Sequence, residues 1–166
     1  MLMNDLFHIA IKTPNLEATR RFYCDVLGMV IDPSRPSATL GFPGYWIRSP
    51  LPGGIALFHV YAGDAALEDD GTMSSGAGVI DHVSVTAQGY FEMRAKLEEA
   101  GLAYRENVLP TIRLWQLFVY DPSGVLLEIT FSADAERAEA PVFPDERRYR
   151  PRERFFDAAR YRALWG

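Results

Sequence analysis

Four side chains that commonly bind metal ions interrupt otherwise apolar segments of this sequence. The chain has three histidines, and each lies within a run of apolar residues rather than in a polar loop. A glutamate interrupts a fourth such run. Burying an ionisable group without a partner is costly, so these positions need an explanation. The four residues are His8, His59, His82 and Glu128.

One histidine in an apolar strand is most often a packed core residue, and that interpretation would hold for any of the three alone. Their spacing favours a shared role, because His82 follows His8 by 82 − 8 = 74 residues and each lies in the first apolar segment of its half of the chain. His59 and Glu128 lie in the last apolar segments of the two halves. Imidazoles and a carboxylate suit Fe(II), Mn(II), Zn(II), Ni(II) or Co(II). We therefore predict a divalent metal at this set.

The apolar pattern predicts two runs of elements in the same order. The first is a strand at 6–11, a helix from about 13 to 27, and about three strands among the segments 29–31, 38–40, 45–47 and 55–61. The second is a strand at 80–85, a helix at 90–100, and strands at 103–108, 114–120 and 125–131. Gly28 and Gly101 end the two helices, and their offset, 101 − 28 = 73, agrees with that of the two histidines.

An internal repeat of this kind determines the fold prediction. We expect an α+β protein in which two βαβββ modules form a curved sheet around one metal-centred cavity. The modules are 5–62 and 79–131, joined by a polar linker at 63–78, and together they make a single domain at 1–132. A C-terminal extension, 133–166, carries apolar and aromatic residues that could form one side of a short helix: Phe155, Phe156, Ala159, Ala163, Leu164 and Trp165. We expect it to dock on the body, closing the cavity or supporting a homodimer.

The composition excludes several classes of function. A net charge of −5 gives no basic surface for nucleic acid. No apolar run approaches the ~20 residues that span a bilayer, and the first residues lack the features of a signal peptide. A single cysteine, Cys24, excludes an intramolecular disulfide and favours the cytoplasm. Its aromatic neighbours favour a packing role for Cys24 over a nucleophilic one.

These segments resemble the vicinal oxygen chelate superfamily, which comprises glyoxalases, extradiol dioxygenases, epimerases and bleomycin or fosfomycin resistance proteins. The resemblance covers roughly residues 5 to 132. It rests on Phe7-His8-Ile9-Ala10-Ile11, Phe22-Tyr23-Cys24-Asp25-Val26-Leu27-Gly28, Asp81-His82-Val83-Ser84-Val85, and Asp121-Pro122-Ser123-Gly124 with Glu128. It implies that His8, His82 and Glu128 are metal ligands and that His59 occupies a variable fourth position. A bulge in 55–61 would place Ala56 there instead.

The resemblance implies coordination of substrate oxygens by the metal but leaves the reaction open. A His-His-Glu triad permits the chemistry of ring-cleaving dioxygenases, so the resemblance favours Fe(II) or Mn(II) as the metal. Their usual pattern also has a histidine before the last turn, absent from 109–112, and a tyrosine where Phe118 stands. The acid–base partner of ring cleavage is therefore missing or supplied elsewhere; Tyr120 is a poor substitute.

Other members of the superfamily fit less well. Glyoxalase I uses a glutamate where His59 lies, and fosfomycin thiol transferases carry a threonine where Ala10 lies. We therefore favour a ring-cleavage-type dioxygenase, with a glyoxalase-like lyase, isomerase or epimerase as the alternative. His59 is either the fourth ligand or a catalytic base.

Arg48 and Arg113 lie near strands bordering the cavity, where they could hold a substrate carboxylate. A non-enzymatic protein that binds a drug or metabolite in the same aromatic cavity is the rival from another class.

Overall fold

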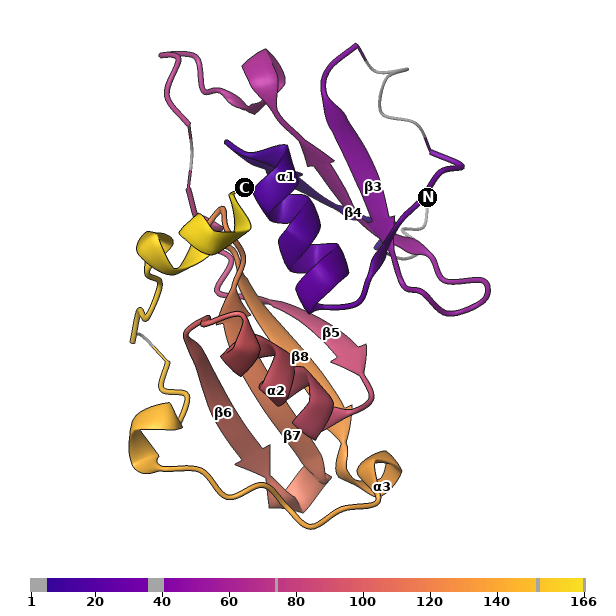
Figure 1. The fold of residues 1–166 in the computed structure, drawn as a ribbon, viewed down its shortest axis with the longest axis vertical. Coiled ribbons are helices and arrows are strands. Elements are labelled where there is room, and N and C mark those ends of the chain that lie inside the picture. Colours follow the sequence, from indigo (N-terminus) through magenta and orange to yellow (C-terminus); the bar gives the residue numbers. More distant parts are fainter. Residues whose placement is uncertain (1–5, 36–40, 74, 152, 166) are drawn as a thin grey trace, which may run out of the picture. The chain divides into compact units, whose positions relative to one another are not determined.

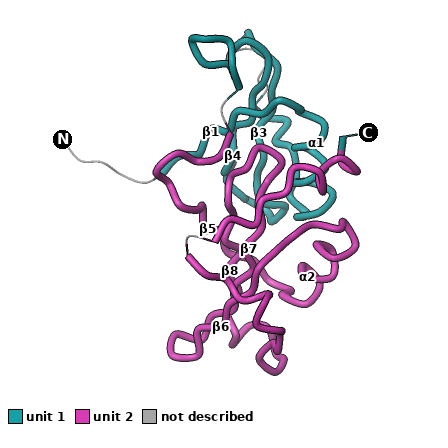
Figure 2. The backbone as a smooth tube through the Cα atoms, turned by 90° about the vertical axis from the view of Figure 1, so that its left-hand side faces the viewer, with its two compact units in different colours: residues 1–74, 165 teal, residues 75–164, 166 magenta. Residues whose placement is uncertain are grey.

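The computed structural model describes residues 6–35, 41–73, 75–151 and 153–165. The chain divides into two compact units, residues 1–74 with 165 and residues 75–164 with 166 (Figure 2). The predicted strand at 38–40 lies outside the described residues. Within the described segments, no helix is long and apolar enough to cross a membrane.

The first unit contains a four-stranded sheet with one helix packed on it (Figure 1). Its strands follow the order β1-β4-β3-β2, in which β1 is parallel to β4 and the other neighbours are antiparallel. The elements are β1 (Ile9–Lys12), α1 (Leu16–Arg20), η1 (Arg21–Val26), β2 (Val30–Ile31), β3 (Gly44–Arg48), β4 (Ala56–Tyr61) and the short η3 (Gly63–Ala66).

The helix of the first unit begins and ends at residues that favour those positions. The Asn15 side chain accepts a hydrogen bond of 2.9 Å from the Ala18 amide, which satisfies one free N–H of the first turn. The last turns, η1, are π-helical rather than α-helical. Gly28 follows at φ 72°, a left-handed conformation that glycine adopts without strain. The predicted helix from about 13 to 27 is therefore confirmed, and its last turns are π-helical.

The second unit repeats this arrangement with the strand order β5-β8-β7-β6. The first and last strands of the unit, β5 and β8, are again parallel. Its elements are β5 (Val83–Ala87), α2 (Tyr90–Glu99), β6 (Tyr104–Leu109), η4 (Pro110–Ile112), β7 (Leu114–Tyr120), β8 (Leu126–Ser132) and α3 (Ala133–Glu136). The shared connectivity confirms the internal repeat and the α+β fold class.

Each helix packs on one face of its own sheet. In the first unit the rings of Tyr23 and Phe58 lie 5.0 Å apart, and both side chains are buried. In the second unit the buried Tyr90 contacts Trp115 and Phe131, at 5.6 and 5.3 Å between ring centroids. Side chains alternate along a strand, so the intervening residues lie on the opposite face. We call that opposite face of each sheet the donor face.

The first strand of each unit begins later than its apolar pattern predicted. β1 begins at Ile9, so His8 precedes the strand, and β5 begins at Val83, so His82 precedes it too. β4 has a register shift just before Phe58, the partner of Ile9, and β8 begins at Leu126, one residue before the partner of Val83. Both histidines therefore lie immediately before the first paired residue of their strands.

The C-terminal extension packs along the second unit (Figure 1). Arg148 forms a parallel bridge with Glu106 of β6, just after the short helix η5 (Asp145–Arg147). The later helix, η6 (Ala158–Leu164), is a 3₁₀ helix. Phe155 and Phe156 precede it, so the predicted single helical face that included them is wrong. Both phenylalanines instead contact Tyr120 at the end of β7.

Candidate metal centre

The two units place a candidate metal ligand at the same position of the sheet. His59 in β4 pairs with Ala10, two residues after His8. Glu128 in β8 pairs with Ser84, which is two residues after His82. His59 and Glu128 are therefore equivalent positions of the repeat, and each lies on the donor face of its sheet.

In the first unit His8 and His59 lie together among aromatic rings. The imidazole of His59 is 6% exposed and stacks on Trp46, with centroids 4.1 Å apart and planes 2° from parallel. The ring of His8 lies 6.0 Å from that of His59 and 4.6 Å from Trp46. The register shift of β3 and β4 falls between Ile47 and Arg48. It therefore leaves His59, rather than Ala56, in register with Ala10 and Trp46.

Burial keeps His59 in its neutral form. Desolvation lowers the pKa of His59 below its ordinary value, and the nearby His8 lowers it further. Nε2 of His59 and Nδ1 of His8 are buried, and neither has a hydrogen-bond partner among the described residues. A neutral imidazole with an unpartnered buried nitrogen is suited to bind a metal, since binding requires the unprotonated nitrogen.

In the second unit His82 and Glu128 are in direct contact. Nε2 of His82 lies 3.3 Å from Oε2 of Glu128. The other carboxylate oxygen, Oε1, accepts hydrogen bonds from the hydroxyls of Ser84 and Thr130, at 2.6 and 2.9 Å. The two hydroxyls thus orient the carboxylate and leave Oε2 directed at the histidine. Metal-binding carboxylates are commonly held in this way.

We expect the Ser84→Ala variant to bind the metal about 10-fold more weakly, because groups that orient a metal ligand contribute this much to affinity. Competition with a chelating dye for Mn(II) or Zn(II) measures the change. Thr86→Val, on the same strand, is the matched control and should leave the affinity unchanged. Equal affinities for Ser84→Ala and the parent protein would show that the Ser84 hydroxyl does not support the site.

The donors are gathered in two pairs, one in each unit. Across residues 6–35, 41–73, 75–151 and 153–165, no group of three or more His, Cys, Asp or Glu side chains is assembled as a metal site. Each pair has donor groups that suit a metal ion: one has two imidazoles with unpartnered nitrogens, and the other has an imidazole and an oriented carboxylate. This donor set fits a divalent ion of the iron-to-zinc series.

Comparisons with known proteins identify the family of this chain. Residues 5–129 match the Glyoxalase/Bleomycin resistance protein/Dioxygenase superfamily. The chain belongs to this superfamily. No curated protein matches the sequence.

Solved structures share the superfamily fold with this chain at low sequence identity. A glyoxalase family protein from Bacillus anthracis has a TM-score of 0.56 and 17% identity, and the match covers 80% of this chain and 98% of that one. The fosfomycin resistance protein FosX from Listeria monocytogenes has a TM-score of 0.56 and 15% identity, covering 78% and 94%. Lactoylglutathione lyase from Agrobacterium tumefaciens has a TM-score of 0.53 and 15% identity, covering 78% and 96%.

The superfamily match ends before a tyrosine that the sequence analysis did not identify. Tyr149, in the C-terminal extension, stacks on Phe118 with centroids 3.7 Å apart and planes 6° from parallel. Phe118 stands where the resemblance to ring-cleaving members led us to expect a tyrosine. No local signal in the sequence singles out Tyr149, because its position depends on where the extension returns to the sheet.

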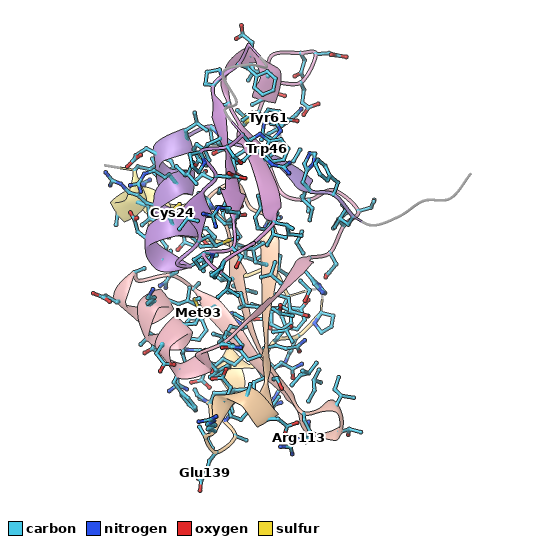
Figure 3. The ribbon with its side chains drawn as sticks, turned by 90° about the vertical axis from the view of Figure 1, so that its right-hand side faces the viewer. Cys24, Trp46, Tyr61, Met93, Arg113 and Glu139 are labelled. Carbon is cyan, nitrogen blue, oxygen red and sulfur yellow. The ribbon has the colours of Figure 1, made fainter. Side chains whose placement is uncertain are left out.

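The arginines that we considered as carboxylate clamps are engaged elsewhere. Arg48 donates a 2.9 Å hydrogen bond to the Ser49 carbonyl. Arg113 pairs with Asp134 at the loop end of the second sheet (Figure 3). Beside Arg113 is a pocket of about 210 Å³, lined mostly by apolar residues of β6, β7 and the segment after β8. His82 and Glu128 are not among the residues that line it.

Proposed function

We propose that this protein is a divalent-metal-dependent enzyme that binds a small, oxygen-bearing organic substrate. His8, His82 and Glu128 would hold the metal, and His59 would serve as fourth ligand or as a base beside it. The observation that carries the proposal is the equivalence of His59 and Glu128 in the two sheets, each beside a histidine that precedes the first strand. A pair from each unit supplies the donors.

The bound metal would stabilise negative charge on the substrate oxygens that it coordinates. The protein's own residues supply the remaining functions. Neutral His59 can accept a proton at Nε2, because that nitrogen has no hydrogen-bond partner in the described chain. Ser84 and Thr130 hold the Glu128 carboxylate in one orientation. Trp46 fixes the plane of His59 by stacking.

Within this class we favour a ring-cleavage-type dioxygenase acting on a catechol-type substrate. Two histidines and one carboxylate with open positions are the donor set of non-haem Fe(II) oxygenases. A glyoxalase-like lyase, isomerase or epimerase is the second candidate. It is supported by the neutral, buried His59, which has the properties of a base for moving a proton between carbon atoms. We also expect a homodimer, as predicted from the sequence.

Anaerobic reconstitution with each metal, followed by oxygen uptake with a panel of catechols, tests the proposal. We expect uptake with Fe(II) or Mn(II) and none with Zn(II), since Zn(II) has no redox chemistry. Absence of uptake with every metal and catechol, despite stoichiometric metal, would favour the lyase or isomerase. Failure to bind any of Fe(II), Mn(II), Zn(II) or Ni(II) would instead favour a non-enzymatic binding protein.

A further inference from the structure

The C-terminal extension is anchored to the second sheet on both sides of Tyr149. The Tyr149 amide donates a 2.9 Å hydrogen bond to the Glu106 carbonyl of β6, next to the bridge made by Arg148. Further along, Glu153 pairs with Arg105 at 3.2 Å. The guanidinium of Arg105 also lies 4.6 Å from the ring centroid of Phe155. The backbone at Tyr149 is therefore held at a defined place on the edge of this sheet.

From this edge the Tyr149 ring extends over the donor face. It stacks on Phe118, which pairs in register with Glu128. The ring of Phe118 lies 5.9 Å from that of His82, edge to face. Both candidate ligands of the second unit therefore lie next to the aromatic stack that the extension completes.

The hydroxyl of Tyr149 is held only loosely by the protein. It donates to Oδ1 of Asp81 at 3.4 Å, well beyond the usual 2.7–2.8 Å of an O–H···O hydrogen bond. The Asp81 side chain is 59% exposed, so water competes for this contact. A hydroxyl with such a weak hydrogen bond loses little free energy when it turns to a stronger acceptor. Asp81 itself directly precedes His82, so the hydroxyl lies at the rim of the proposed site.

We propose that Tyr149 is a substrate-binding residue, whose hydroxyl donates a hydrogen bond to an oxygen of a catechol-type substrate at the His82–Glu128 pair. The inference rests on the proposed function. It gives the extension a direct role in the site. Stacking on Phe118 fixes the orientation of the Tyr149 ring, and the backbone contact with β6 fixes how far its hydroxyl extends over the sheet. A charged substrate oxygen is a stronger acceptor than the distant Asp81 carboxylate.

Tyr149→Phe tests the hydroxyl because it keeps the ring stack on Phe118. The measurement is the anaerobic affinity of the Fe(II)- or Mn(II)-loaded protein for 4-nitrocatechol, followed by its absorption change. We expect the Kd of Tyr149→Phe to rise about tenfold, as for loss of a hydrogen bond to a charged group. Metal affinity and melting temperature should stay within error of the parent protein.

Tyr161→Phe is the matched control, because it removes a hydroxyl from the same extension at another place. That hydroxyl donates to the Tyr120 carbonyl, so its loss should lower the melting temperature and leave the 4-nitrocatechol affinity unchanged. An unchanged Kd in Tyr149→Phe, with tight binding by the parent protein, would overturn the role of Tyr149 alone. No binding of 4-nitrocatechol by the metal-loaded parent protein would overturn the ring-cleavage assignment and this inference together.

Discussion

Glu128→Gln is expected to abolish tight metal binding. A four-ligand site with roughly 10–16 kcal/mol of binding free energy gives each ligand about 2.5–4 kcal/mol, or roughly 10²- to 10³-fold in affinity. The amide keeps the shape of the side chain and an acceptor for Ser84 and Thr130, but it loses the negative charge. Isothermal titration or dye competition with Mn(II) and Zn(II) measures the loss. The fold should persist, since the substitution is isosteric.

His59→Ala separates the two roles that we assign to His59. If His59 is a base beside the metal, this variant should bind the metal only about 10-fold more weakly than the parent, as for a residue that supports a ligand. A loss as large as that of Glu128→Gln would make His59 an obligatory ligand. Glu99→Gln is the matched control for Glu128→Gln, because it makes the same chemical change at an exposed position of α2. Its metal affinity should equal that of the parent.

Glu106→Leu is expected to lower the free energy of unfolding by about 3 kcal/mol. Glu106 is 1% exposed and accepts a hydrogen bond from the hydroxyl of the fully buried Tyr90. The guanidinium of Arg94 lies 3.7 Å from the same carboxyl oxygen. Removing the carboxyl leaves a buried hydroxyl without its acceptor and a guanidinium without its partner. Urea unfolding, followed by circular dichroism, measures the change.

The double variant Tyr90→Phe/Glu106→Leu tests whether the two groups act as a pair. Removing both partners leaves no buried hydroxyl without an acceptor. The loss in free energy of unfolding of the double variant should therefore be smaller than the sum of the two single losses, by at least about 1 kcal/mol. Strict additivity would show that the Tyr90–Glu106 contact contributes no coupling energy. Glu99→Leu on the exposed side of α2 is the control, and should change stability by less than about 0.5 kcal/mol.

The order of elements along the chain and the ends of the helices follow from local features of the sequence. Gly28 and Gly101 end the helices because each adopts the left-handed conformation, at φ 72° and 67°. Alternation along β4 and β8 places His59 and Glu128 opposite the helix-packed face, since strand side chains repeat every two residues. The superfamily match over residues 5–129 confirms the resemblance that those segments carried.

Other features of the site depend on contacts between segments that are far apart in the sequence. Ser84 orients Glu128 only because β5 and β8 pair in one register. Tyr149 reaches Phe118 only because the extension returns along β6, and no periodicity in 133–166 predicts that path.

The sequence by itself therefore determined the two modules, the superfamily and the pairs of candidate ligands, because helix stops and strand alternation act over a few residues. The tertiary structure decided the partners that support them: the Ser84 hydroxyl on Glu128, the buried Tyr90–Glu106 contact and the Tyr149 ring stacked on Phe118. These partners come from strands and segments that meet only after the chain has folded. Their positions follow from sheet register and from the edge of β6 that the extension joins.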